Sequence, residues 1–132
     1  MSTGTSTKVT IALSFVTPPP GLAPLVDFSL EAISGADGLY ALQALDDVHK
    51  RMFVLDAGVY LPDYTPVLSD AQCTALSLTD PDDAQVLVVA TAGQGPTTVN
   101  LLAPIIVNRK TDICAQFILD GQDFPLRAPL GS

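Results

Sequence analysis

The sequence contains few residues that could act directly on a substrate. His49 is the only histidine, and it stands between Val48 and Lys50 in a polar stretch that predicts a loop. A general base needs a nearby nucleophile and a third group that orients it, and the sequence identifies neither. We therefore interpret His49 as a solvated loop residue, and we expect that the protein is not an enzyme.

The two cysteines, Cys73 and Cys114, are far apart and form no Cys-x-x-Cys pair. A nucleophile–base pair of Cys114 with His49 is compatible with the sequence, but Cys114 lacks the flanking positive charge that activates a thiol. The simpler interpretation of Cys114 is an ordinary strand residue. Because the chain carries no recognisable export signal, we expect both cysteines to be free thiols in a reducing cytoplasm.

Three patterns resemble ligand sites but lack defining parts. Asp80-Pro81-Asp82-Asp83 offers the carboxylates that calcium prefers, yet it lacks the calcium-binding loop and its terminal Glu, so it predicts an acidic turn. One histidine and two separated cysteines do not make a typical zinc site. Gly93-Gln94-Gly95-Pro96 lacks the Gly-Lys-Ser or Gly-Lys-Thr of a phosphate loop and predicts a connection between strands. The sequence therefore predicts no metal and no cofactor.

The charge balance disfavours several classes of partner. The formal net charge is -8, with only six Lys and Arg. Direct binding to nucleic acid or to an anionic membrane is therefore disfavoured, and a basic protein is the natural partner. No run approaches the roughly 20 apolar residues of a membrane-spanning helix. Residues 46–83 hold eight Asp and two basic residues, which leaves two interpretations open: an acidic docking surface or ordinary solvated loops.

The length of 132 residues fits one domain, and 48% of the residues are hydrophobic. Residues 1–7 are small and polar and predict a flexible N-terminal tail, so the single domain is expected to span residues 8–130. Residues 7–16 alternate between apolar and polar types, as in a strand with one buried face. Similar reasoning predicts strands over residues 25–32, 39–45, 52–56, 85–92, 101–107, 112–119 and 123–126.

One short helix is predicted between the strands. Ser69 is a residue type that caps helices, and Gln72 stands three residues later, at the spacing of a capping box. Leu68 and Cys73 then occupy the two positions of a hydrophobic staple, so Cys73 is expected to face the core. Only about two turns fit before Ser77, so this helix must depend on packing for its stability.

Together these elements predict a mainly β protein. Residues 85–92 are apolar on both faces, which is typical of a strand that is covered on both sides. Pro104 has no backbone N–H to donate and must lie at a strand start, a bulge or an edge. About eight strands and one short helix predict a small closed or nearly closed antiparallel β-barrel, because closure hides strand edges that would otherwise aggregate.

Several motifs occur in a fixed order along the chain. The most extensive is Thr98-Val99-Asn100-Leu101-Leu102-Ala103-Pro104-Ile105-Ile106-Val107-Asn108, followed by Gln116-Phe117-Ile118-Leu119-Asp120 and Phe124-Pro125-Leu126-Arg127-Ala128-Pro129-Leu130. Upstream stand Leu42-Gln43-Ala44-Leu45-Asp46-Asp47, Leu61-Pro62-Asp63-Tyr64, Leu68-Ser69-Asp70 and Asp82-Asp83-Ala84-Gln85-Val86-Leu87. This ordered set resembles the FliW family of flagellar assembly factors over residues 21–130. Ala128, Phe124 and Val99 depart from the usual His, Tyr and Ala of that family.

The resemblance implies a β-barrel-like fold and a non-enzymatic role in flagellar assembly. Members of the family bind flagellin in the cytoplasm. They also bind the RNA-binding regulator CsrA and relieve its repression of flagellin translation. For this chain we accordingly expect flagellin and CsrA as partners, a cytoplasmic location, and a monomer in the free state.

The motifs and the charge pattern give two sets of candidate residues. Partner contacts are expected from Asp46, Asp47, Asp63, Tyr64, Asp82 and Asp83. Structural roles are expected for Asn100, Pro104, Gln116 and Arg127: Asn100 would satisfy backbone groups beside the Pro104 irregularity, and Arg127 would pair with a carboxylate. Two alternatives stay open: a β-barrel module that binds a small molecule, and a degenerate family member that binds flagellin only.

Overall fold

The computed structural model describes residues 10–19, 22–47, 49–91, 97–119 and 121–129. Within these ranges the strands are β1 (Thr10–Phe15), β2 (Asp27–Ala32), β3 (Leu39–Ala44), β4 (Arg51–Asp56), β5 (Ala84–Thr91), β6 (Thr98–Val99), β7 (Ile105–Asn108), β8 (Ile113–Gln116) and β9 (Ala128–Pro129). The helices are α1 (Ala57–Tyr60), α2 (Asp70–Ala75) and the 3₁₀ turn η1 (Pro81–Asp83). The predicted tail, the loop at 93–96 and Asp120 lie outside the described residues.

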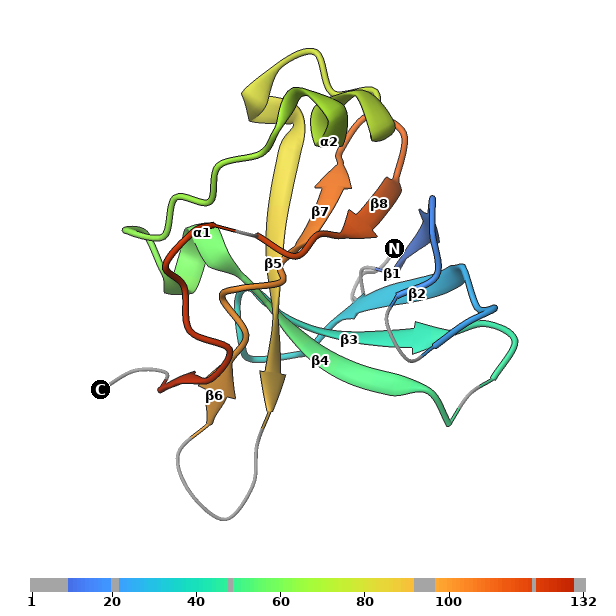
Figure 1. The fold of residues 1–132 in the computed structure, drawn as a ribbon. Helices are drawn as coiled ribbons and strands as arrows, with labels where there is room; N and C mark the ends of the chain where they lie inside the picture. Colours follow the sequence, from blue (N-terminus) through green and yellow to red (C-terminus); the bar gives the residue numbers. More distant parts are fainter. Residues whose placement is uncertain (1–9, 20–21, 48, 92–96, 120, 130–132) are drawn as a thin grey trace, which may run out of the picture.

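The strands form one sheet that closes into a barrel. Its order is β4-β3-β2-β1-β8-β7-β5-β6-β9, and a further pairing of β4 with β5 completes a ring of seven strands. Figure 1 shows β2, β3 and β4 side by side, with β5 running from the α2 end of the molecule towards β6. The predicted closed barrel is confirmed. Strands β6 and β9 extend the sheet beyond the ring as a short antiparallel pair.

One pairing of the ring corrects the expectation of a fully antiparallel barrel. β1 and β8 pair in parallel, with Ser14 opposite Ile113 and Phe15 opposite Cys114. The reason is the number of strands. In a ring of consecutive antiparallel neighbours, an even number lets the first and last strands run in opposite directions, whereas seven makes them run in the same direction.

The barrel interior is the main core. Side chains from all seven ring strands fill it, and the alternation predicted for residues 7–16 places Leu13 and Phe15 inside. The rings of Phe15 and Phe28 meet edge to face with centroids 5.0 Å apart, a favourable arrangement for two aromatic rings. The other buried members are Leu30, Leu42, Ala44, Val54, Leu87, Ile105, Val107 and Cys114.

Two smaller apolar clusters cover the outside of the barrel, one on each side of β5. Val88 packs with Leu55, Ala57 and Val99 beneath α1 and β6, and Val86 borders the cluster of Leu76, Ile106 and Ala115 near α2. Strand β5 is therefore covered on both faces, as its apolar sequence predicted.

Several boundaries differ from those predicted. Helix α1 was not expected: Asp56 caps it by accepting a hydrogen bond from the Gly58 backbone N–H at 2.8 Å. Of the strand predicted at 101–107, only the second half is a strand, as part of β7; residues 101–103 form bends, and Pro104 lies just before the start of β7. The final strand is β9, not residues 123–126. No helix in the described part of the chain is long and apolar enough to cross a lipid bilayer.

Candidate partner-binding groove

The residues singled out for chemistry do not come together. Cys114 is fully buried in the barrel core, where burial, followed by the charge of Asp112, raises the pKa of its thiol to about 12. His49 is exposed in the turn between β3 and β4, and its backbone N–H donates to Asp47 Oδ1 at 3.1 Å. Among the described residues, no group of three or more His, Cys, Asp or Glu could hold a metal ion.

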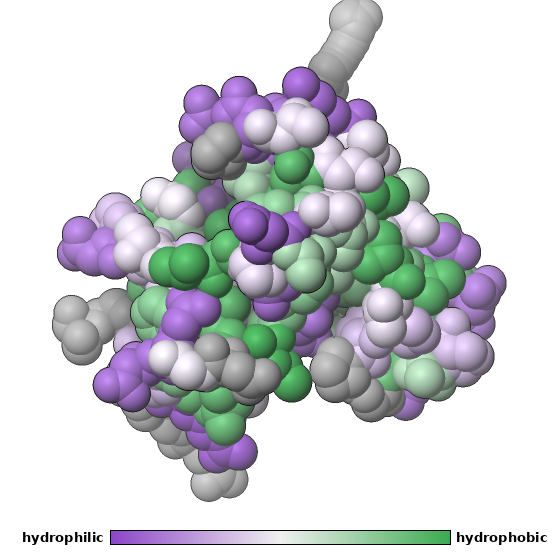
Figure 2. Space-filling model, turned by 45° about the horizontal axis from the view of Figure 1, so that its top comes forward, coloured by the Kyte–Doolittle hydropathy of each residue, from purple (hydrophilic) through white to green (hydrophobic). Residues whose placement is uncertain are grey.

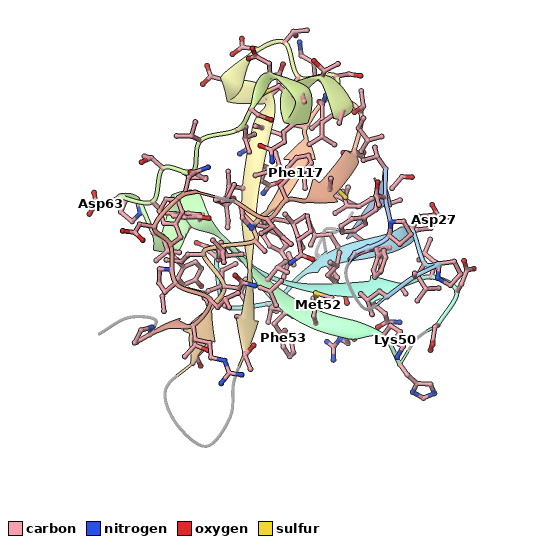
Figure 3. All side chains as sticks on the ribbon, viewed as in Figure 1. Asp27, Lys50, Met52, Phe53, Asp63 and Phe117 are labelled. Atoms are coloured by element: carbon pink, nitrogen blue, oxygen red, sulfur yellow. The ribbon has the colours of Figure 1, made fainter. Side chains whose placement is uncertain are left out.

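The six residues predicted to bind partners lie at three separate places. Asp46 and Asp47 are in the β3–β4 turn, where the Lys50 backbone N–H donates to the Asp47 carbonyl oxygen at 3.0 Å. Figure 3 shows Lys50 and Asp63 on opposite sides of the molecule. Asp82 and Asp83 belong to η1 at the start of β5. The aspartates thus do not form one continuous acidic surface.

The two members of the Asp82–Asp83 pair differ in exposure and in the contacts seen among the described residues. Asp83 is 18% exposed and forms an ion pair with Lys110 at 3.3 Å, and its carbonyl oxygen accepts the Arg109 N–H at 2.7 Å. These contacts join the start of β5 to the β7–β8 hairpin. Asp82 is exposed, and its backbone N–H donates to Asp80 Oδ1 at 3.0 Å.

Tyr64 lies in a shallow hollow of about 370 Å³ with Tyr60, Leu101 and Phe124. Its hydroxyl donates to the Leu101 carbonyl oxygen, and its ring meets Phe124 edge to face with centroids 4.9 Å apart. Burial raises the pKa of Tyr64 to about 12. Tyr64 therefore anchors the segment after α1, while Asp63 beside it is exposed.

The four residues expected to be structural differ in their hydrogen bonds. Asn100 Oδ1 accepts hydrogen bonds from the backbone N–H groups of Leu102 and Ala103, at 3.1 and 3.0 Å. Gln116 Nε2 donates to the Ala103 carbonyl oxygen at 3.0 Å, and the buried Pro104 carbonyl oxygen accepts from Phe117. Arg127 is exposed, and no ion pair with a carboxylate is seen for it among the described residues.

Helix α2 begins as the sequence predicts. Ser69 Oγ accepts from the Gln72 N–H at 3.1 Å, and the Gln72 side chain accepts from the Ser69 N–H at 2.8 Å, which completes the capping box. Both residues of the expected staple, Leu68 and Cys73, are partly buried and face the same hollow. The cap therefore fixes where the helix starts and orients its apolar side.

The helix ends in a Schellman motif. The Leu78 N–H donates to the Cys73 carbonyl oxygen at 2.9 Å, and the Ser77 N–H donates to the Thr74 carbonyl oxygen at 3.0 Å. Ser77, the first residue after the helix cap, adopts the left-handed conformation with a φ of 55°. Such a motif brings the residue after the turn, Leu78, back against the helix residue Cys73.

Two side-chain amides, not recognised in the sequence, hold the segment around α2 to the rest of the fold. Asn108, only 2% exposed at the end of β7, donates from Nδ2 to the Leu76 carbonyl oxygen at 2.8 Å and accepts from the Lys110 N–H at 2.9 Å. Gln122 exchanges two hydrogen bonds with the Val67 backbone, at 3.0 and 2.8 Å. The sequence did contain a signal for Asn108: a polar residue directly after the apolar run 105–107 is expected to be buried and hydrogen-bonded.

An open groove lies between this segment and the barrel wall. Its volume is about 400 Å³, and no residue of α2 itself is fully buried, although Leu76 directly after the helix is. We call it the α2 groove and define it by its apolar lining: Pro66, Leu68, Cys73, Leu78, Val86 and Ile106. Figure 2 shows hydrophobic residues exposed across the middle of one face of the molecule, with hydrophilic residues mostly towards its edges.

Comparison with known proteins identifies the fold. A crystal structure of the flagellar assembly factor FliW superimposes with a TM-score of 0.83 and 24% identity, covering 92% of this chain and 86% of that chain. At this identity the similarity supports a shared barrel architecture.

Sequence relatives give the family. Flagellar assembly factor FliW of Desulfitobacterium hafniense is 37% identical over 69% of this chain, and that of Geotalea uraniireducens is 36% identical over 67%. The matches span 61% and 55% of those two relatives. The Bacillus subtilis protein of the same name is 26% identical, with 85% of this chain and 80% of that protein covered. The family model for FliW protein matches residues 2–130. Because this match spans nearly the whole sequence, the chain belongs to the FliW family of flagellar assembly factors.

Proposed function

We propose that this chain is a cytoplasmic, non-enzymatic assembly factor that binds flagellin and antagonises the translational regulator CsrA. Membership of the FliW family supports this proposal. The observation that carries it is the α2 groove, an apolar hollow at the surface of a chain whose Cys114 is buried in the core while His49 is exposed. Such a surface is suited to holding another polypeptide.

The charge of the chain suits a basic partner. With a net charge of -8, the protein is complementary to a regulator that binds RNA through basic residues. Exposed charges mainly raise the association rate, and salt screens them. Raising ionic strength from about 0.05 M to about 0.5 M is therefore expected to slow association with CsrA.

Gel filtration with light scattering tests the proposal. The purified chain is expected to co-elute with monomeric flagellin and, separately, with CsrA at micromolar concentration. In a reconstituted translation system, it should also restore flagellin synthesis that CsrA has repressed. Absence of both complexes would contradict the proposal. A complex with flagellin but not with CsrA would instead identify a family member that keeps one partner.

The alternative of a small-molecule barrel receives less support. Such a site requires a hollow inside the barrel with several convergent polar groups. Among the described residues, the interior is occupied by the apolar side chains of the main core. The α2 groove lies outside the ring and is also mostly apolar.

A further inference from the structure

We propose that the α2 groove is the docking site for an amphipathic helix of a partner protein whose apolar stripe is flanked by Lys or Arg. This inference rests on the proposed function, because it places a polypeptide partner on a defined surface. Nothing in it depends on which of the two partners supplies the helix.

The lining of the groove requires apolar side chains from the occupant. Leu68, Cys73 and Leu78 form the wall on the α2 side, and Val86 and Ile106 come from β5 and β7. Ile106 is fully buried, whereas Leu78 and Val86 remain partly exposed. A hollow of about 400 Å³ can hold a few aliphatic side chains, and filling it would remove the exposed parts of these residues from water.

The sheet beneath the groove argues for a helix and against an added strand. β5 is paired with β4 on one side and with β7 on the other, and β7 is in turn paired with β8. These strands therefore offer no free edge for β-augmentation at the groove floor. A segment that gains no backbone partners from the sheet is best suited to the groove as an α-helix, whose backbone hydrogen bonds are internal.

The charge beside the groove selects a basic helix. Asp80 lines the groove and is exposed. Asp70 stands three residues before Cys73 on α2, which places it on the same side of the helix, and Asp82 is bonded through its backbone to Asp80. The nearby Lys110 is already paired with Asp83. The three exposed aspartates, Asp70, Asp80 and Asp82, are here called the acidic rim, and they complement Lys or Arg on the occupant.

Cys73 can report whether the α2 groove is occupied. Cys73 lies in the groove wall and is partly exposed, whereas Cys114 is fully buried in the barrel. The rate at which maleimide alkylates Cys73, measured by mass spectrometry, should therefore fall when the groove is filled. Alkylation of Cys114 records global unfolding in the same sample.

The first experiment uses two synthetic helical peptides that share one leucine stripe. One carries Lys on its polar face and the other carries Glu. At saturation the Leu/Lys peptide is expected to slow Cys73 alkylation by about tenfold or more, because a filled groove excludes solvent and reagent. The Leu/Glu peptide should give little protection at low salt. Equal protection by both peptides, or by neither, would overturn the proposal.

Matched variants test the acidic rim. The triple variant Asp70→Asn, Asp80→Asn and Asp82→Asn removes the rim charge, and Asn keeps the capping ability of Asp80. It should weaken Leu/Lys peptide binding by about tenfold at low salt. The control variant Asp27→Asn, Asp37→Asn and Asp123→Asn changes the net charge equally at exposed sites and should weaken binding less than about twofold. Equal weakening in both variants would show that only net charge matters and would contradict the proposed site.

Full-length partners separate failure of this inference from failure of the proposed function. If flagellin or CsrA co-elutes with the chain while Cys73 stays as reactive as in the free protein, the groove assignment is wrong and the proposed function stands. If neither partner binds but the Leu/Lys peptide protects Cys73, the groove assignment stands and the proposed function is wrong.

Discussion

The barrel interior and the segment around α2 are held in place by different interactions. Inside the barrel, apolar side chains such as Phe28, Leu42 and Val54 are fully buried and pack on one another. Residues 66–78 have one fully buried anchor, Leu76 against Ile106 and Ala115, and otherwise depend on a capping box, a Schellman motif and the side-chain amides of Asn108 and Gln122. No residue of α2 itself is fully buried.

This difference means that one part of the molecule stabilises the fold, whereas another keeps apolar side chains accessible to a partner. A packed interior gives a cooperative fold but presents little to another molecule. A short segment that is fixed by one buried side chain and by directional hydrogen bonds can leave its other apolar side chains partly exposed. The FliW fold can therefore remain stable while one side keeps apolar side chains accessible.

The largest expected effect on stability comes from removing an aromatic side chain from the barrel core. Phe28→Ala should destabilise the protein by about 3–5 kcal/mol, because it removes a fully buried aromatic ring that packs against Phe15. Phe53, which is 42% exposed with Arg51 5.1 Å above its ring, is the matched control. Phe53→Ala should cost only about 1 kcal/mol. Urea unfolding measures both, and similar losses would contradict the assignment of the barrel interior as the main source of stability.

A smaller effect is expected from removal of the Asn108 amide. Asn108→Ala leaves the Leu76 carbonyl group without its buried donor and should cost about 1–3 kcal/mol. Because the lost amide holds Leu76, which follows α2, the rate of maleimide alkylation should increase more at Cys73 than at Cys114. Gln122→Ala, at a more exposed contact, should cost less. Equal increases at both cysteines would show that the α2 segment does not move separately from the barrel.

The free energy of unfolding should also depend on pH in the alkaline range. The pKa of Cys114 is raised from 9.0 to about 12 in the folded protein, so the unfolded chain loses its thiol proton first as the pH rises. The contribution is fully present below about pH 9 and is lost progressively towards pH 12. Unfolding free energy should fall by roughly 1–2 kcal/mol between pH 8.5 and 10.5. Cys114→Ala should reduce this slope, and an unchanged slope would contradict burial of an un-ionised thiol.

The smallest expected effect is a gain in stability. Ser77 has a φ of 55° at the position of the Schellman motif that glycine usually occupies. Ser77→Gly should relieve this conformation and stabilise the protein by a few tenths of a kcal/mol up to about 1 kcal/mol. Thermal unfolding measures the change. A clear loss of stability would indicate that the Ser77 side chain contributes a contact that outweighs the backbone strain.

The predictable part of this fold comes from strong local signals. Strict alternation placed Leu13 and Phe15 inside the barrel, and the Ser69–Gln72 spacing gave the start of α2. Helix α1 was missed because Gly58 and Val59 are weak helix formers, and its Asp56 cap follows directly from β4. The parallel β1–β8 pairing depends on the number of strands in the ring, which no short segment determines.

The candidate site was less predictable than the fold. The charge pattern left open an acidic docking surface or ordinary solvated loops, and the tertiary structure separates Asp47, Asp63 and Asp82. Asp83 is used internally in its ion pair with Lys110. The α2 groove arises from the space between a short helix and the barrel wall, and this space depends on packing between distant parts of the chain. Sequence patterns describe the walls of such a groove but not its width.

The β1–β8 pairing has a consequence for how the protein is made. Strands β1 to β5 can each pair with a neighbour soon after synthesis, whereas β1 gains its second neighbour only when β8 has left the ribosome. Until that point the nascent chain is an open sheet with unpaired edges, and the entropy of joining its ends opposes closure. Ring formation therefore waits until β8 has been synthesised, and a ribosome-bound chain that stops before Ile113 cannot form the barrel.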